Sequence, residues 1–74
     1  MHIGHRVRDR RSELGVNQIE LANYLGMDQA QLSRLESQAD WGNVTVRTTI
    51  KIAAALKVTV PWILGMDAER ERDL

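Results

Sequence analysis

Apolar residues recur at helical spacing along the chain, in segments separated by polar residues and glycines. In the first segment Ile3, Val7 and Leu14 fall on one side, with arginines mostly around the other. The later segments repeat this spacing of apolar residues, and the last of them is short and lies near the end of the sequence. It predicts an all-α fold whose helices cover residues 3–14, 18–25, 29–37, 46–56 and 60–64.

Residues that begin and end helices stand between these segments. Each predicted helix after the first follows a side chain that can accept hydrogen bonds from free backbone N–H groups: Asn17, Asp28, Thr45 and Thr59. Gly15 and Gly26 are expected to end the first two helices, because glycine tolerates positive φ. Lys57 stands after the fourth helix, so the chain must turn there without a glycine.

The same pattern selects the side chains that should face a common core. Leu21, Ala22 and Leu25 face inward from the second helix, with Ile19 less certain and Val16 stapled against them. The other residues predicted to face inward are Leu32, Leu35, Val46, Thr49, Ile52, Ala53 and Leu56.

The second and third helices are joined by Gly26, Met27 and Asp28, which is enough chain only for a tight turn between two packed helices. Polar side chains that can pair with base edges remain on the outward face of the third helix. Glutamine and arginine can bind adenine and guanine edges at two points in the major groove, and alanine can contact a thymine methyl group. This outward face consists of Gln29, Ala30, Ser33 and Arg34.

Two separated motifs resemble the Cro/repressor (XRE-like) helix-turn-helix family. They are Gln18-x-x-Leu21-Ala22-x-x-Leu25-Gly26-Met27-Asp28-x-x-x-Leu32-Ser33-Arg34-Leu35-Glu36 and Ala55-Leu56-x-Val58-Thr59-Val60-x-Trp62-Ile63-Leu64. The resemblance covers roughly residues 3–64. It implies a compact five-helix lambda-repressor-like DNA-binding domain, expected to occupy residues 1–65, with a short acidic tail at 66–74.

The docking of such domains assigns expected roles to individual residues. The start of the third helix enters the major groove, so Gln29, Ala30, Ser33 and Arg34 are expected to contact bases. The resemblance implies that Gln18 holds a phosphate, at a helix end that already favours anions. Other expected contacts to the DNA backbone are Asn17, Gln31, Asn43 and Arg47. Relatives that dimerise suggest a subunit contact through Trp62, Ile63 and Leu64.

The arginines of the first helix leave two interpretations open. They could form a ridge facing phosphates, or a solvated face paired with Asp9 and Glu13, which is the expectation for Arg6 and Arg10. Glu36 is expected to pair with Arg10 or Arg11 inside the protein, because a carboxylate beside phosphates would repel them.

The segment from Gln38 to Val44 departs from the family pattern, because Asp40 stands where relatives are more basic. Side-chain phosphate contacts are therefore in doubt here, although backbone N–H groups of Gly42 and Asn43 could serve. Trp41 could pack back on the third helix, lie against a sugar or sit at a subunit contact, in that order of preference.

Charge and composition limit the possible functions. Residues 1–63 hold eight Lys and Arg against six Asp and Glu, and residues 64–74 hold two against four, so the domain carries +2 and the tail −2. Electrostatic attraction to DNA should be modest per monomer, and useful affinity would need two copies. Cysteine is absent and no apolar run approaches the roughly 20 residues of a membrane span, so we expect a cytoplasmic, nucleoid-associated protein.

These observations predict a sequence-specific regulator of transcription that binds double-stranded DNA, acting as a dimeric repressor on a palindromic operator. The alternative is an antitoxin with a toxin partner, or an adaptor that kept the fold, which the net neutrality and the apolar C-terminal edge favour. An enzyme is not expected, since the chain has no cysteine nucleophile, its histidines are near the start, and no Gly-rich phosphate loop or carboxylate pair is visible. No cofactor is expected, and His2 and His5 alone make a poor metal site.

Overall fold

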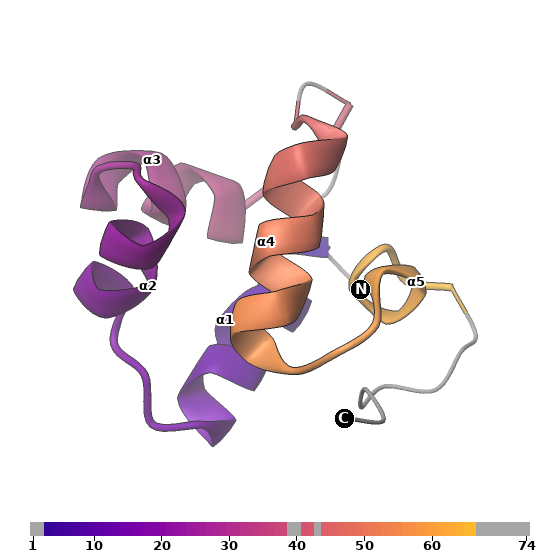
Figure 1. Cartoon of the computed structure of the whole chain (residues 1–74), viewed down its shortest axis with the longest axis horizontal. Helices are drawn as coiled ribbons and strands as arrows, with labels where there is room; N and C mark the ends of the chain where they lie inside the picture. The colour runs from indigo at the N-terminus through magenta and orange to yellow at the C-terminus, as the bar shows by residue number, and fades with distance from the viewer. Residues whose placement is uncertain (1–2, 39–40, 43, 67–74) are drawn as a thin grey trace.

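In the computed structural model, which describes residues 3–38, 41–42 and 44–66, helices account for nearly all regular structure (Figure 1). They are α1 (Ile3–Glu13), α2 (Gln18–Leu25), α3 (Gln29–Glu36), α4 (Val46–Leu56) and α5 (Val60–Ile63). Figure 1 shows α4 running through the middle, with α2 and α3 on one side and α5 on the other. The predicted all-α fold of five helices is confirmed.

Both helices of the helix-turn-helix begin with a capping box. The side chain of Asn17 accepts from the backbone N–H of Glu20 at 2.8 Å, and the Glu20 side chain accepts in return from the N–H of Asn17. Asp28 and Gln31 make the same reciprocal pair at the start of α3. Between them Gly26 adopts φ 71°, so both ends of the short turn are fixed by local chemistry.

The predicted caps of the later helices are also present. Thr45 accepts from the backbone N–H of Thr48, and Thr59 accepts from that of Trp62. At the end of α4, Lys57 has φ 57° and ψ 44°, the left-handed conformation that glycine usually supplies. Its N–H donates to the carbonyl oxygens of Ala53 and Ala54 in the last turn of α4. The helix therefore ends at the predicted residue, with a backbone conformation that is unfavourable for a residue other than glycine.

The core is mostly aliphatic, with Trp41 as its one aromatic member among the described buried residues, and all five helices contribute to it. Its fully buried members include Val7, Leu32, Ile52, Leu56, Val58 and Ile63. Most predicted inward residues are buried, but Ile19, the less certain one of α2, is 54% exposed. Val46 is 76% exposed, because it stands at the first turn of α4 beyond the end of the core. Leu14 is also exposed, since α1 ends one residue before it.

Two arginines of α1 are not solvated as expected, although Arg10 makes the predicted ion pair with Glu13, with Nη1 3.4 Å from Oε1. Arg10 is buried and donates through Nε to the carbonyl oxygen of Leu56 at 3.0 Å. Arg6 donates to the carbonyl oxygen of Trp62 at 3.1 Å, and its guanidinium lies 4.8 Å from the centre of the Trp62 ring. Both carbonyls belong to late elements of the chain. The long side chains therefore fasten α1 to the ends of α4 and α5.

The start of α1 is pressed against the end of α3. The backbone N–H of Gly4 donates to the carbonyl oxygen of Gln38 at 3.0 Å. A Cβ atom at Gly4 would overlap the backbone of Leu35 and Glu36. Glycine is thus required here for close approach between two helices, and this contact helps to set the position of α3.

Candidate nucleic-acid interface

The outward face of α3 presents the polar residues that the sequence assigned to DNA. Gln29, Ala30, Ser33 and Arg34 are all exposed. On the opposite face Leu32 is fully buried and Leu35 is half-buried against the core. The four outward side chains therefore stand on a helix whose other face is anchored in the core.

A continuous set of hydrogen bonds connects the interior to the start of this face. Arg11 donates to both carboxylate oxygens of Glu36, with Nε–Oε2 at 2.7 Å and Nη2–Oε1 at 3.0 Å. Gln18 Nε2 donates to Glu36 Oε1 at 3.1 Å, and Gln18 Oε1 accepts from Gln29 Nε2, also at 3.1 Å. We call this set, Arg11, Glu36, Gln18 and Gln29, the amide relay.

The amide relay confirms the internal pairing predicted for Glu36, and it gives Gln18 partners within the protein that were not predicted. Glu36 is 4% exposed and pairs with an arginine inside the protein, which is Arg11 and not Arg10. Gln18, expected to hold a phosphate, has both ends of its amide bonded within the protein. A carbonyl oxygen and one N–H are used in these bonds, which leaves one N–H for another partner.

The contact between Gln18 and Gln29 was not predicted from the sequence. Both residues are the first of their helices, and only three residues join the two helices. The short turn places the start of α3 beside the end of α2, about 12 Å along the helix from Gln18. The contact between the two first residues depends on the angle at which the helices cross, which the sequence pattern does not give.

The remaining predicted DNA-backbone residues are placed differently from one another. Asn17 and Gln31 are exposed, but the side-chain oxygen of each is used in a capping box. Arg47 is exposed in the first turn of α4. Asn43 and Asp40 lie outside the described residues.

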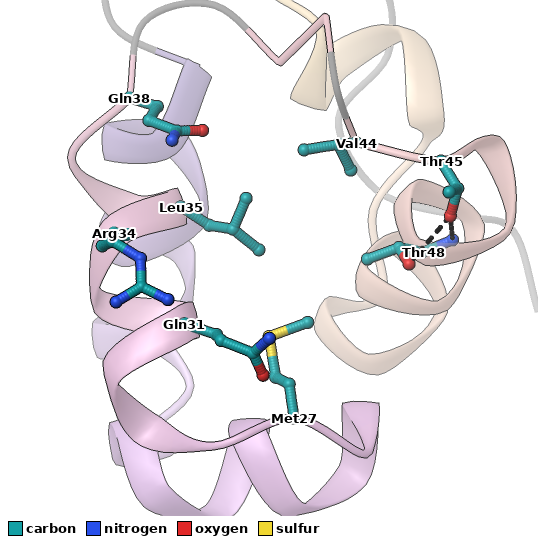
Figure 2. Close-up of a pocket in the computed structure, with 8 residues that line it drawn as sticks. All are labelled: Met27, Gln31, Arg34, Leu35, Gln38, Val44, Thr45 and Thr48. Carbon is teal, nitrogen blue, oxygen red and sulfur yellow. Dashed lines mark hydrogen bonds between the residues drawn. The ribbon is translucent and has the colours of Figure 1, made fainter.

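A gap of about 270 Å³ separates the second half of α3 from the start of α4 (Figure 2). Figure 2 shows Leu35 and Val44 facing each other across it. Polar side chains make up much of its lining: Gln31, Arg34, Gln38, Thr45 and Thr48. Arg34, a predicted base contact, therefore stands at the edge of a hollow and not on a closed surface.

Trp41 packs back on α3, which is the first of the three positions considered for it. Its ring is buried in the core, and its indole N–H donates to the carbonyl oxygen of Leu35 at 3.2 Å. The carbonyl of Trp41 in turn accepts from the N–H of Val44 at 2.9 Å. Trp41 thus satisfies a carbonyl in the last turn of α3 and holds the following segment against the domain.

The three residues of the predicted subunit contact differ in how far they are buried. Ile63 is 0% exposed and belongs to the core of the monomer, so its side chain is not available to a second copy. Trp62 is half-buried beneath Arg6, whereas Leu64 is 41% exposed. Leu64 also lines an apolar hollow of about 200 Å³, together with Trp41, Val44, Val46, Thr49 and Val60.

Metal and membrane sites receive no support from the described part of the chain. Within it, three or more histidine, cysteine, aspartate or glutamate side chains never gather as a metal site would require. His2, one half of the pair considered for a metal, lies outside that part. None of the described helices combines the length and apolar character needed to cross a bilayer.

A comparison with protein families agrees with the architecture and with the turn between α2 and α3. The model of one family, described as Helix-turn-helix, matches residues 7–63. The matched range covers most of the chain and includes the whole amide relay, the outward face of α3 and the hollow beside it. The chain belongs to this XRE-type helix-turn-helix family of DNA-binding regulators.

Proposed function

We propose that the protein is a sequence-specific regulator of transcription that binds double-stranded DNA through α3 and represses by occupying a palindromic operator as a dimer. One observation carries the proposal. The outward face of α3 exposes Gln29, Ala30, Ser33 and Arg34, while Leu32 anchors the helix from beneath. Such a rigid row of donors, acceptors and a small apolar group suits the major groove.

The proposed roles within the site follow from exposure and position. Gln29, Ala30, Ser33 and Arg34 contact base edges. Arg47 and the remaining N–H of Gln18 contact phosphates. Asn17 and Gln31 contact them through their side-chain NH₂ groups, and Asn43 is a further phosphate contact. The binding unit is residues 1–65, and the acidic tail at 66–74 takes no part, because its carboxylates would be repelled by phosphates.

Dimer formation is supported by charge and by exposed apolar surface. A domain carrying only +2 gains little from phosphate attraction, so two linked copies would supply the missing affinity. Leu64 and Met66 are exposed and lie in sequence just after α5. We place the subunit contact at Trp62 and Leu64, without the buried side chain of Ile63.

Selection from random duplexes, followed by binding measurements on single variants, tests this function. A palindromic product with half-sites about one helical turn apart is the expected result. Arg34→Ala should reduce discrimination at one position of each half-site by about 1–3 kcal/mol. Lys51→Ala, a matched loss of charge on the exposed side of α4, should leave the preference unchanged. A selection that yields no preferred sequence would refute the proposal.

A second candidate is an antitoxin or adaptor whose main partner is a protein. The observation that favours it is exposed apolar surface: Val46, Ile50, Leu64 and Met66 are all exposed. In that case Val46→Asp and Leu64→Asp should abolish association with a co-purifying toxin while binding to DNA is kept. If sedimentation shows that these variants only convert a dimer to a monomer, the surface serves self-association instead.

A further inference from the structure

The hollow between α3 and α4 has a floor of apolar side chains. Met27, Leu35 and Val44 line it and are half-buried, each packed against the core. Figure 2 shows Leu35 and Val44 facing one another from opposite sides, with Met27 at the lower end. The volume of about 270 Å³ is a little below the roughly 300 Å³ at which pockets for small molecules usually begin. The space therefore suits one aromatic ring or a short alkyl chain.

Hydrogen-bond donors surround this floor. Gln31 uses its side-chain oxygen in the capping box with Asp28, and its NH₂ group remains available. The hydroxyl oxygen of Thr48 accepts from Thr45 Oγ1 at 3.0 Å, so the hydroxyl proton of Thr48 can be donated to another group. The exposed side chain of Gln38 adds a second NH₂ group at the same edge. A ligand that accepts hydrogen bonds is favoured here.

Arg34 gives the hollow its charge. It is the one charged residue among the eight described residues that line the space, so no carboxylate of the lining opposes an anion. Arg10 and Arg11 of α1 are paired with Glu13 and Glu36, whereas the exposed Arg34 guanidinium has no such partner in the described part of the chain. A carboxylate only accepts hydrogen bonds, and at this edge it meets a cation and several donors.

We propose that this hollow binds a small carboxylate with an apolar body of about one aromatic ring, and that the bound carboxylate pairs with Arg34. The ring covers Met27, Leu35 and Val44, and removal of this apolar surface from water adds to the attraction between the charges. A phosphate group of DNA can use the same donors, but it has no apolar body to cover the floor.

The bound carboxylate weakens the binding of DNA. Arg34 is one of the proposed base contacts, and a guanidinium held by a carboxylate no longer presents its donors to a guanine edge. Gln31, a proposed phosphate contact, donates to the same ligand. This effect on DNA rests on the proposed function, whereas binding of the ligand to the free protein does not. A small molecule of this class therefore acts as an inducer.

Phenylacetate is the probe, titrated into the protein without DNA and followed by backbone amide chemical shifts. We expect saturable binding, with the largest shifts at Leu35, Val44 and Thr48. Phenylacetamide, the uncharged counterpart, should bind at least about tenfold more weakly because it loses the ion pair. Acetate lacks the ring and should also bind at least about tenfold more weakly. Absence of binding, or equal affinity for phenylacetate and either comparator, would overturn the inference.

Two variants locate the site. Arg34→Gln should weaken the binding of phenylacetate by roughly tenfold, while Lys51→Gln, the same loss of charge on the exposed side of α4, should leave it unchanged. Thr48→Leu fills the hollow with a larger apolar side chain and should abolish binding of phenylacetate. Thermal unfolding shows whether Thr48→Leu is folded; if it is not, Arg34→Gln decides alone. Equal binding by Arg34→Gln and Lys51→Gln would contradict the proposed site.

Binding to a selected duplex tests the regulation. With phenylacetate at about ten times its own dissociation constant, the apparent dissociation constant for the duplex should rise at least about tenfold. Acetate at the same concentration controls for ionic strength. Thr48→Leu, which changes none of the proposed DNA contacts, should bind the duplex equally in both salts. Equal effects of the two salts on the native protein would overturn the competition. If no duplex is preferred, the proposed function fails, and titration of the free protein still decides the ligand site.

Discussion

At the scale of single residues, a buried ion pair lies at the inner end of the hydrogen bonds that reach the start of α3. Glu36 and Arg11 form a pair in which the carboxylate is 4% exposed and accepts two short hydrogen bonds from the guanidinium. A pair of this kind contributes little net stability when intact, because both ions lose their hydration. Removing one partner is costly, because it leaves the other charge without compensation.

Glu36→Ala should therefore lower the free energy of unfolding by about 3–5 kcal/mol, since the Arg11 guanidinium would lose its partner in a largely buried position. Chemical denaturation of the purified domain measures the change. Asp9→Ala removes a carboxylate whose contact with Arg8 is exposed, at 3.5 Å, and should change stability by less than about 1 kcal/mol. Equal effects of the two variants would mean that Glu36 is not held as described.

Lys57 has a left-handed backbone conformation, which a residue with a Cβ atom adopts only at a cost in free energy. A left-handed conformation costs an ordinary residue about 1–2 kcal/mol, while glycine loses roughly 0.5–1 kcal/mol through the greater freedom of its unfolded chain. Lys57→Gly should thus stabilise the domain by about 0.5–1 kcal/mol, measured by thermal or urea denaturation. Lys51→Gly, within α4, should destabilise it by about 1 kcal/mol. A loss of stability in Lys57→Gly would contradict the strain at this turn.

At the scale of elements, the position of α3 depends strongly on α1. The backbone of Gly4 lies directly against Leu35 and Glu36, and its N–H binds the carbonyl oxygen of Gln38. Trp41 binds the carbonyl oxygen of Leu35 from the following segment. The end of α3 is thus held from both sides by hydrogen bonds that begin outside the helix-turn-helix.

Gly4→Ala tests the contact between these helices. Helix propensity alone predicts that alanine in α1 stabilises the domain by about 1 kcal/mol. The overlap with the backbone of α3 should reverse the sign and cost about 1–3 kcal/mol. Ser12→Ala, at an exposed position of the same helix, should be neutral or slightly stabilising. If the denaturation midpoints of both variants moved in the same direction, the close approach of Gly4 to the backbone of α3 would be contradicted.

At the scale of the whole molecule, the fold uses much of its positive charge internally. Arg6, Arg10 and Arg11 all donate hydrogen bonds to protein oxygens. On the proposed DNA surface the exposed cations are Arg34 and Arg47, among the described residues. Affinity for DNA should consequently depend more on shape and hydrogen bonds than on phosphate neutralisation.

The dependence of DNA affinity on salt measures this directly. Each phosphate neutralised contributes about −0.9 to the slope of log K against log salt, so two cations per protomer predict a slope of about −4 for a dimer. Arg47→Ala should make the slope shallower by about 2 in the dimer. A slope near −8 in the native protein would show that the arginines of α1 reach the DNA after all.

Local chemistry explains which parts of the fold could be predicted from the sequence. The caps at Asn17, Asp28, Thr45 and Thr59 depend on a few neighbouring residues, and each is present. The positions of α3 and of its exposed face follow from these caps and from the periodic leucines. The family resemblance further indicated that Glu36 would bind an arginine.

The rest could not be predicted, because it depends on contacts between distant segments. The helical period of α4 placed Val46 inward, but where the core ends depends on the elements packed around it. Arg6 and Arg10 find carbonyl acceptors 56 and 46 residues away along the chain. Gln18 was expected to contact DNA, and its internal partners depend on how α2 and α3 meet at the turn.

The hollow between α3 and α4 bears on how the domain would meet a duplex of unusual shape. Leu35 and Val44 face each other across about 270 Å³ there, and Gln31, Arg34 and Gln38 border the same space. These side chains have room to change conformation while α3 itself stays in place, so the contact surface can follow a groove that is bent or widened. We expect tolerance toward operators that differ in flexibility at base pairs the protein does not touch.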